Sequence, residues 1–186
     1  MDVIKYEIPL LPMRKLKQKN TDLTYLTKEQ LLNLLQQVDN STNESLPYVV
    51  KIALATGARW SECEGLTHDK LKNNGFYFTD TKNGQSRFVP VSDQLYQLVC
   101  ERLKQSSFIS CYAAFRSAYN RTHLKSRGQC AHILRHTFAS HFVMAGGNLT
   151  ALRQILGHSS LTVTMKYAHL APDYLNQAVQ LNPLEN

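Results

Sequence analysis

The spacing of apolar residues changes twice along this 186-residue chain. Over residues 27–65 it follows the helical period, with a capping-box pattern at Thr27 and a helix stop at Gly57. Residues 70–91 instead carry strand-like runs of aromatic and β-branched side chains. The helical period returns after residue 92. We therefore predict an α+β fold that is mainly helical, with one small antiparallel β-sheet.

Local signals predict the individual elements within this outline. Ser61 and Glu64 have the spacing of a second capping box, which would put Arg59 at a junction between two helices. The sheet has two strong turn signals, Asn74-Gly75 and Asn83-Gly84. Lys82 would then lie at the tip of the second hairpin. Further helices are expected at residues 93–104, 110–121, 131–145 and 149–156.

Charge is distributed unevenly along the sequence. The formal net charge is +7, and no Asp or Glu occurs between Arg102 and Pro172, where nine Lys or Arg residues lie, counting Arg102. A stretch of this kind favours an anionic partner such as nucleic acid, and a generally solvated basic surface explains the asymmetry poorly. Because the stretch offers no carboxylate to hold a divalent cation, phosphate chemistry there would depend on side-chain charge and a side-chain nucleophile.

The four cysteines show neither metal-site spacing nor a C-x-x-C pair; they are Cys63, Cys100, Cys111 and Cys130. We expect free thiols in a reducing cytoplasm. The sequence has no apolar run long enough to span a bilayer and no signal-peptide pattern, so we expect no membrane partner.

The histidines could act as metal ligands or as phosphate ligands. His132 and His136 have the spacing of zinc proteases, but the glutamate of that motif is missing and Arg135 adds positive charge to the same turn. We therefore expect no metal ion or other cofactor. His132 and Arg135 share one helical face, and a guanidinium can bind two phosphate oxygens at once. His136 fits equally well as a packed, hydrogen-bonded core residue.

Three further residues are candidates for the same site. Arg59 would complete a two-arginine phosphate clamp, although an isolated arginine between helices is more often a salt-bridge partner. His158 follows the helix-ending Gly157, which would expose its ring. Tyr167 lies near the end of a short helix that Ser160 opens, so its hydroxyl could return towards His158.

Five short segments together resemble the signature of the tyrosine recombinases, in order and in approximate spacing. The resemblance is strongest to the integrases of temperate bacteriophages. The resemblance covers residues 24–182. Each segment alone is a weak signal, but their joint occurrence is specific. The segments are Ala55-Thr-Gly-Ala-Arg-Trp-Ser-Glu62, Lys82 in its hairpin, His132-x-x-Arg135-His-Thr137, Leu156-Gly-His-Ser-Ser160 and Lys166-Tyr-Ala-His169.

The resemblance implies how a scissile phosphate would be bound. Arg59 and Arg135 would stabilise the charge on its oxygens, and His158 would hydrogen-bond one of them.

It also implies which residues would move protons and form the covalent bond. Tyr167 would be the nucleophile and form a 3′-phosphotyrosyl link. A ring of cations would make its attack feasible near neutral pH. His132 would accept a proton or orient a group, and Lys82 would protonate the departing 5′ oxygen.

The implied function is site-specific DNA recombination in phage integration and excision. Double-stranded DNA attachment sites would be the substrate and a tetramer on DNA the assembly. A directionality factor and a host DNA-bending protein are candidate partners. Two alternatives stay open: a type IB topoisomerase-like enzyme that relaxes DNA, and a catalytically silent DNA-binding regulator.

The domain organisation follows from the same resemblance. Residues 1–22 are expected to be an interdomain linker or N-terminal extension, and residues 23–186 a catalytic domain that includes a C-terminal tail at 170–186. Members of the family normally carry an N-terminal DNA-clamping domain. We therefore expect this chain to be the catalytic domain of a longer integrase, with a naturally short protein as the alternative.

Overall fold

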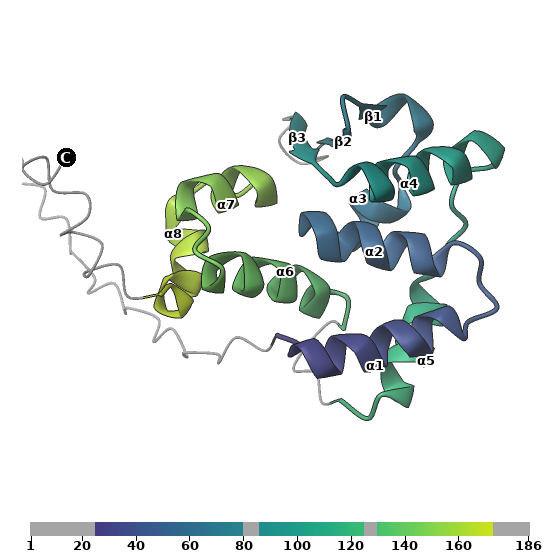
Figure 1. Ribbon diagram of the computed structural model, residues 1–186, viewed down its shortest axis with the longest axis horizontal. Helices are drawn as coiled ribbons and strands as arrows, with labels where there is room; N and C mark the ends of the chain where they lie inside the picture. The colour runs from purple at the N-terminus through teal and green to yellow at the C-terminus, as the bar shows by residue number, and fades with distance from the viewer. Residues whose placement is uncertain (1–24, 80–85, 125–129, 173–186) are drawn as a thin grey trace, which may run out of the picture.

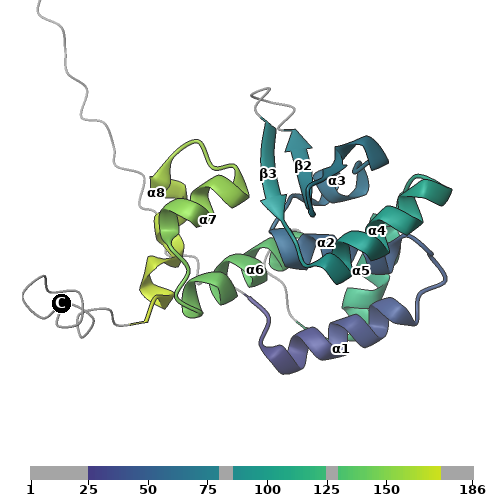
Figure 2. The same cartoon turned by 45° about the horizontal axis from the view of Figure 1, so that its top comes forward.

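The computed structural model describes residues 25–79, 86–124 and 130–172, and the structural statements below concern these ranges. Within them the chain is mainly helical with one three-stranded antiparallel sheet, which confirms the predicted fold class (Figures 1 and 2). The expected linker, the hairpin tip with Lys82 and most of the expected tail lie outside the described residues.

The N-terminal part contains the predicted helices, which are α1 (Lys28–Asp39), α2 (Leu46–Thr56) and α3 (Trp60–Glu64). Thr27 and Gln30 form the predicted capping box of α1, in which the Thr27 hydroxyl accepts a hydrogen bond from the Gln30 backbone at 3.3 Å. Gly57 ends α2 in a left-handed conformation with φ 63°. A Cβ at this position would also lie 2.4 Å from the Phe138 ring, so only glycine fits here.

The capping box predicted at Ser61 and Glu64 is wrong. The residue that caps α3 is Arg59, whose backbone N–H donates to the Glu62 carboxylate at 2.7 Å. Glu62 lies three residues after the cap and can reach back to it, whereas Ser61 is already inside the helix. The Glu64 carboxylate instead accepts from the Cys111 backbone N–H at 2.6 Å.

The sheet follows a short 3-10 turn, η1 (His68–Lys70), and its strands pair in the order β1 (Leu71–Lys72), β2 (Gly75–Thr79) and β3 (Ser86–Pro90). The sequence predicts the first turn at Asn74-Gly75, but the turn lies one residue earlier. Asn73 and Asn74 both have positive φ, at 52° and 53°. A two-residue hairpin turn of type I′ requires this at both central residues, and asparagine tolerates it. Gly75 is instead needed within β2, because the Phe88 ring occupies the space of a side chain there.

The later helices agree with the predicted ranges to within two residues; they are α4 (Asp93–Gln105), α5 (Tyr112–Arg121), α6 (His132–Met144) and α7 (Leu149–Leu156), followed by α8 (Leu161–Thr164) and η2 (Met165–Leu170). None of the helices in the described ranges combines the length and apolar character needed to span a membrane.

Helix α6 connects two hydrophobic clusters. Its first turn packs into the larger core, which α1 to α5 and the sheet build, and its later turns pack against α7 and η2 (Figures 1 and 2). The smaller cluster consists of Ala139, Val143, Leu152, Leu156 and Tyr167. The candidate nucleophile is therefore a core residue, held where α6 meets η2.

Candidate active site

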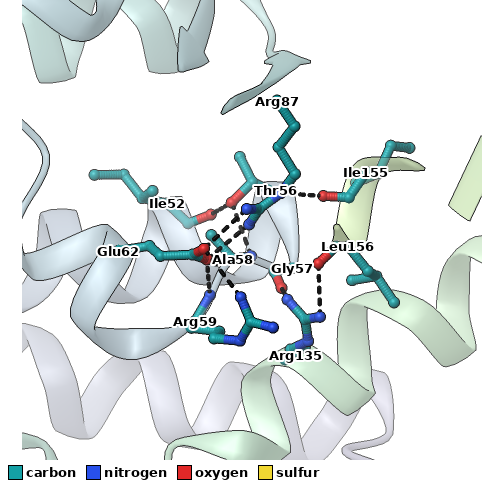
Figure 3. A network of polar contacts seen from close by, with 10 residues as sticks. All are labelled: Ile52, Thr56, Gly57, Ala58, Arg59, Glu62, Arg87, Arg135, Ile155 and Leu156. Carbon is teal, nitrogen blue, oxygen red and sulfur yellow. Dashed lines mark hydrogen bonds and ion pairs between the residues drawn. The ribbon is translucent and has the colours of Figure 1, made fainter. Parts of the chain in front are cut away.

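The Arg135 guanidinium joins the ends of two helices. It is 8% exposed, and it donates to the Gly57 carbonyl after α2 at 2.8 Å and to the Leu156 carbonyl at the end of α7 at 2.7 Å (Figure 3). Helix C-termini carry partial negative charge, which stabilises a buried cation. Because a guanidinium has further N–H donors, these two bonds leave donors for an anion. Arg135 is thus held by two helix ends and keeps N–H donors that can serve an anion.

Other cations surround Arg135. Burial, followed by the charges of Arg59 and Arg87, lowers the pKa of Arg135 to about 10, so the group stays protonated near neutral pH. Figure 3 shows Arg59 and Arg87 joined to the Glu62 carboxylate, and Arg135 joined to Gly57 and Leu156. The excess of positive charge favours an anionic ligand at this place.

A buried ion pair between Glu62 and Arg87 ties the sheet to two helices. The Arg87 nitrogens Nη1 and Nη2 donate to the two Glu62 oxygens at 2.8 and 2.7 Å, and Arg87 Nε donates to the Ile155 carbonyl in α7 at 2.7 Å. Both side chains are about one-tenth exposed, at 10% and 9%. Burial alone would raise the pKa of Glu62, but the hydrogen bonds from Arg87 and from the Arg59 backbone lower it below its usual value. Glu62 therefore stays ionised, and strand β3 is fixed to α3 and α7.

Arg87→Gln is expected to destabilise the protein by about 3–5 kcal/mol, because it removes the buried cation from the Glu62 carboxylate and leaves only the more exposed Arg59 beside it. Urea unfolding followed by circular dichroism measures this loss. Arg116→Gln, which removes the same charge from an exposed position on α5, is the matched control and should change stability little. Equal stabilities of the two variants would show that the Glu62–Arg87 pair does not hold the elements together.

Arg59 lies at the start of α3, at the junction that the sequence predicts. Its Nη1 is 3.3 Å from Glu62 Oε1, and its side chain is 39% exposed. It follows two residues after Gly57, whose carbonyl binds Arg135 (Figure 3). The two arginines named by the sequence are therefore brought to the same helix junction, and Arg59 is the more exposed of them.

The His158 ring is half-buried, so the prediction of an exposed ring is wrong. Helix α8 packs against α7, and the Thr164 hydroxyl lies 2.9 Å from His158 Nδ1. Burial, with the charges of Arg135 and Lys166, lowers the pKa of His158 to about 4, so the imidazole is neutral near pH 7. In the tautomer in which Nδ1 accepts from the Thr164 hydroxyl, Nε2 carries the ring proton and can donate it to a phosphate oxygen.

Tyr167 does not turn its hydroxyl towards His158 as expected. Its side chain is 0% exposed, and its hydroxyl lies 2.8 Å from His136 Nδ1. Burial raises the pKa of Tyr167 to about 12, and the charge of Arg135 opposes this rise without overcoming it. The charge of Arg135 favours the phenolate, but burial of the ring in an apolar cluster outweighs it, so the phenol stays protonated near neutral pH. Lys166 covers this ring, with Nζ 5.0 Å from its centroid.

His132 and Lys82 are the two remaining candidates. His132 is exposed at the first position of α6, and burial of part of its ring, with the charge of Arg135, lowers its pKa. Lys82 lies outside the described residues. Within the described ranges, no three side chains of His, Cys, Asp or Glu gather in a way that could hold a metal ion.

Sequence reasoning missed two residues of this region. Arg87 stands alone in a strand and carries no spacing signal, and its partner Glu62 is 25 residues away. Thr164, which binds His158, looks like an ordinary helix residue. Only the folded arrangement reveals either role.

Comparison with known proteins identifies the family. Residues 24–173 match the family model described as "Phage integrase family". The chain belongs to this family. It is 46% identical to the integrase of Escherichia phage 186 over 181 residues, which cover 97% of this chain and 54% of that protein. It is 34% identical to the integrase of Escherichia phage P2, over 96% of this chain and 52% of that protein. The chain thus spans about half the length of these phage integrases.

A solved structure agrees with the family assignment and the fold. The catalytic domain of bacteriophage HP1 integrase superimposes with a TM-score of 0.83 and 45% sequence identity, covering 89% of this chain and 98% of that domain. The resemblance to tyrosine recombinases is confirmed, because the tyrosine recombinase XerD of Rhizobium meliloti is also similar, at 28% identity over 71% of this chain. This phage integrase family member therefore has the fold of an integrase catalytic domain.

Proposed function

We propose that this chain is the catalytic domain of a site-specific DNA recombinase that cleaves and rejoins DNA in phage integration and excision. One observation carries the proposal. Arg135 binds the carbonyls at the ends of α2 and α7 and keeps donors for a phosphate, and Arg59 and His158 each lie two residues after one of these carbonyls.

In the proposed reaction Tyr167 Oη attacks the scissile phosphorus, the bond to the 5′ oxygen breaks, and a 3′-phosphotyrosyl bond forms. Arg59 and Arg135 stabilise the charge on the phosphate oxygens, and His158 donates a further hydrogen bond from Nε2. The ester energy is retained in the protein–DNA bond, so attack by another 5′ hydroxyl can reseal the strand. The reaction consumes no ATP.

We further propose double-stranded attachment-site DNA as the substrate and a tetramer on DNA as the assembly, with a directionality factor and a host DNA-bending protein as accessory partners. XerH, a site-specific recombinase of the same fold at 21% identity and a TM-score of 0.69, was solved bound to palindromic difH substrate. Action on phage and bacterial DNA would take place in the cytoplasm of the host cell.

Covalent capture tests the proposal and requires no defined target sequence. The chain is incubated with a pool of duplexes of randomised sequence that carry a nick. A nick just downstream of the cleaved bond lets the fragment with the free 5′ hydroxyl diffuse away, so the covalent complex accumulates and survives denaturing electrophoresis. The captured strands, once sequenced, give a defined substrate. Absence of any adduct would favour the silent DNA-binding regulator.

The topoisomerase-like alternative predicts a different product. A relaxing enzyme would remove supercoils from plasmids regardless of sequence and would yield no recombinant molecules. Captured strands that share no sequence, together with relaxation alone, would therefore support that alternative over recombination.

Lys82 is proposed as the acid that protonates the departing 5′ oxygen. Lys82→Ala is expected to slow cleavage by about 10²-fold or more on ordinary DNA, since the alkoxide is a poor leaving group. The defect should largely disappear when the bridging 5′ oxygen is replaced by sulfur, which leaves without protonation. Single-turnover cleavage is measured on the captured duplex with oxygen and on the same duplex with sulfur at the bridging 5′ position. Equal defects of Lys82→Ala on these two substrates would assign the acid to another residue.

A further inference from the structure

The hydrogen bond between His136 and Tyr167 connects the candidate nucleophile to a group that the family signature does not assign a task. His136 Nδ1 lies 2.8 Å from the Tyr167 hydroxyl, and the two rings are 6.0 Å apart at their centroids. The residues are 31 positions apart in the sequence and meet because η2 packs on α6. The contact is thus made by the fold and not by local sequence.

Tyr167 needs a proton acceptor in this environment. Its side chain is fully buried and its pKa is raised to about 12, so the phenolate is scarce near neutral pH. A phenol in such a setting attacks only if its proton is removed as the new bond forms. His132, the acceptor implied by the family resemblance, is an exposed residue one helical turn earlier in α6. His136 is the histidine whose ring nitrogen contacts the hydroxyl.

We infer that His136 is a catalytic residue, which binds the Tyr167 hydroxyl and accepts its proton as Oη attacks the scissile phosphate. The inference rests on the proposed function. The proton passes from Oη to Nδ1 while the Oη–P bond forms and the P–O5′ bond breaks, and the 5′ oxygen takes a proton from a separate acid. In the resealing step His136 returns the proton to Tyr167.

The protonation state of His136 suits this task. Burial, and then the charges of Lys166 in η2 and of His132 and Arg135 in α6, lower the pKa of His136 to about 4. The imidazole is therefore neutral near pH 7, and in the tautomer with the proton on Nε2 its Nδ1 can accept from the Tyr167 hydroxyl.

Phosphate binding would strengthen this base. Arg135 directly precedes His136, and its charge acts on both His136 and Tyr167. A phosphate bound to Arg135 would therefore act electrostatically on the same two groups. Its negative charge would offset the cations that lower the pKa of His136, so the imidazole would become more basic when DNA is in place.

Two substitutions separate proton transfer from positioning. His136→Asn keeps a polar group that can accept a hydrogen bond from the hydroxyl but cannot take up the proton, whereas His136→Ala removes both functions. We expect single-turnover formation of the covalent adduct to fall by about 10²-fold or more in both variants. Melting followed by circular dichroism verifies that each variant is folded. The wild-type rate should vary little between pH 7 and 8.5, while both variants should gain about tenfold per pH unit, because hydroxide must then ionise the phenol.

A more acidic phenol tests the inference chemically. Replacement of Tyr167 by a ring-fluorinated tyrosine lowers the phenol pKa, and the defect of His136→Ala should shrink accordingly. Sulfur at the bridging 5′ position should leave that defect unchanged, because the role concerns the nucleophile and not the leaving group. A defect unaffected by the fluorinated tyrosine, or one relieved by sulfur, would overturn the inference.

Adduct formation by the wild-type protein and by His136→Asn gives two different results to compare. If wild-type protein forms the adduct and His136→Asn forms it equally fast or faster, His136 only holds the Tyr167 hydroxyl in place. The inference is then overturned, and the proposed function stands. If wild-type protein forms no adduct, the proposed function is overturned and the inference with it.

Discussion

Tyr167→Phe is expected to abolish the covalent protein–DNA adduct completely while changing DNA affinity by no more than about twofold, because the substitution removes the attacking oxygen and no charge. Denaturing electrophoresis measures the adduct, and gel shifts measure the affinity. The variant also leaves His136 Nδ1 without its 2.8 Å contact, which is expected to cost about 1–3 kcal/mol of stability.

Tyr119→Phe is the matched control for this substitution. Tyr119 is also buried, and no hydrogen-bond partner of its hydroxyl is found among the described residues. Removal of this oxygen should leave both stability and adduct formation near wild-type values. An adduct that persists in Tyr167→Phe, or one lost equally in Tyr119→Phe, would refute the assignment of the nucleophile.

Arg135→Lys is expected to slow cleavage by about 10²- to 10³-fold, although the charge is kept. A lysine cannot bind the Gly57 and Leu156 carbonyls and a phosphate at once, because it lacks the planar set of donors. Single-turnover rates at saturating protein measure the chemical step apart from binding.

Stability must be separated from chemistry for this variant. The carbonyls left without Arg135 are expected to cost about 1–3 kcal/mol of folding free energy, so rates are compared at a temperature where both proteins are folded. Arg116→Lys, an exposed arginine in α5, serves as the control. Loss of one donor that stabilises charge in the transition state usually costs much more than about threefold in rate. If Arg135→Lys cleaves within about threefold of the wild-type rate, Arg135 therefore holds the two helices together and does not act on the phosphate.

The helices and their ends could be predicted from the sequence because their signals are local. Thr27 caps α1, and Gly57 and Gly157 end α2 and α7 in the left-handed conformation that glycine adopts without strain. The errors arose where two local signals compete. Glu62 rather than Ser61 defines the start of α3, and the turn uses Asn73 in place of Gly75.

The contacts within the candidate site could not be predicted in the same way. Motif spacing in the sequence identifies Arg59, Arg135, His158 and Tyr167 as candidates. It does not indicate which distant side chains each of them contacts in the fold. Tyr167 meets His136 and not His158, because η2 packs against α6 and α8 holds His158 through Thr164. Its pKa rises although cations are near, because burial in an apolar cluster outweighs their charges. Such effects depend on three-dimensional packing, which spacing along the chain does not encode.

Mass spectrometry of the covalent adduct, formed on the captured nicked duplex in buffer with EDTA, tests the central claim most directly. After digestion by protease and nuclease, we expect the peptide that contains Tyr167 to carry a nucleotide linked through its 3′ phosphate, at the same yield with and without magnesium. A nucleotide on another residue, or an adduct that forms only with magnesium, would contradict the proposed tyrosine mechanism.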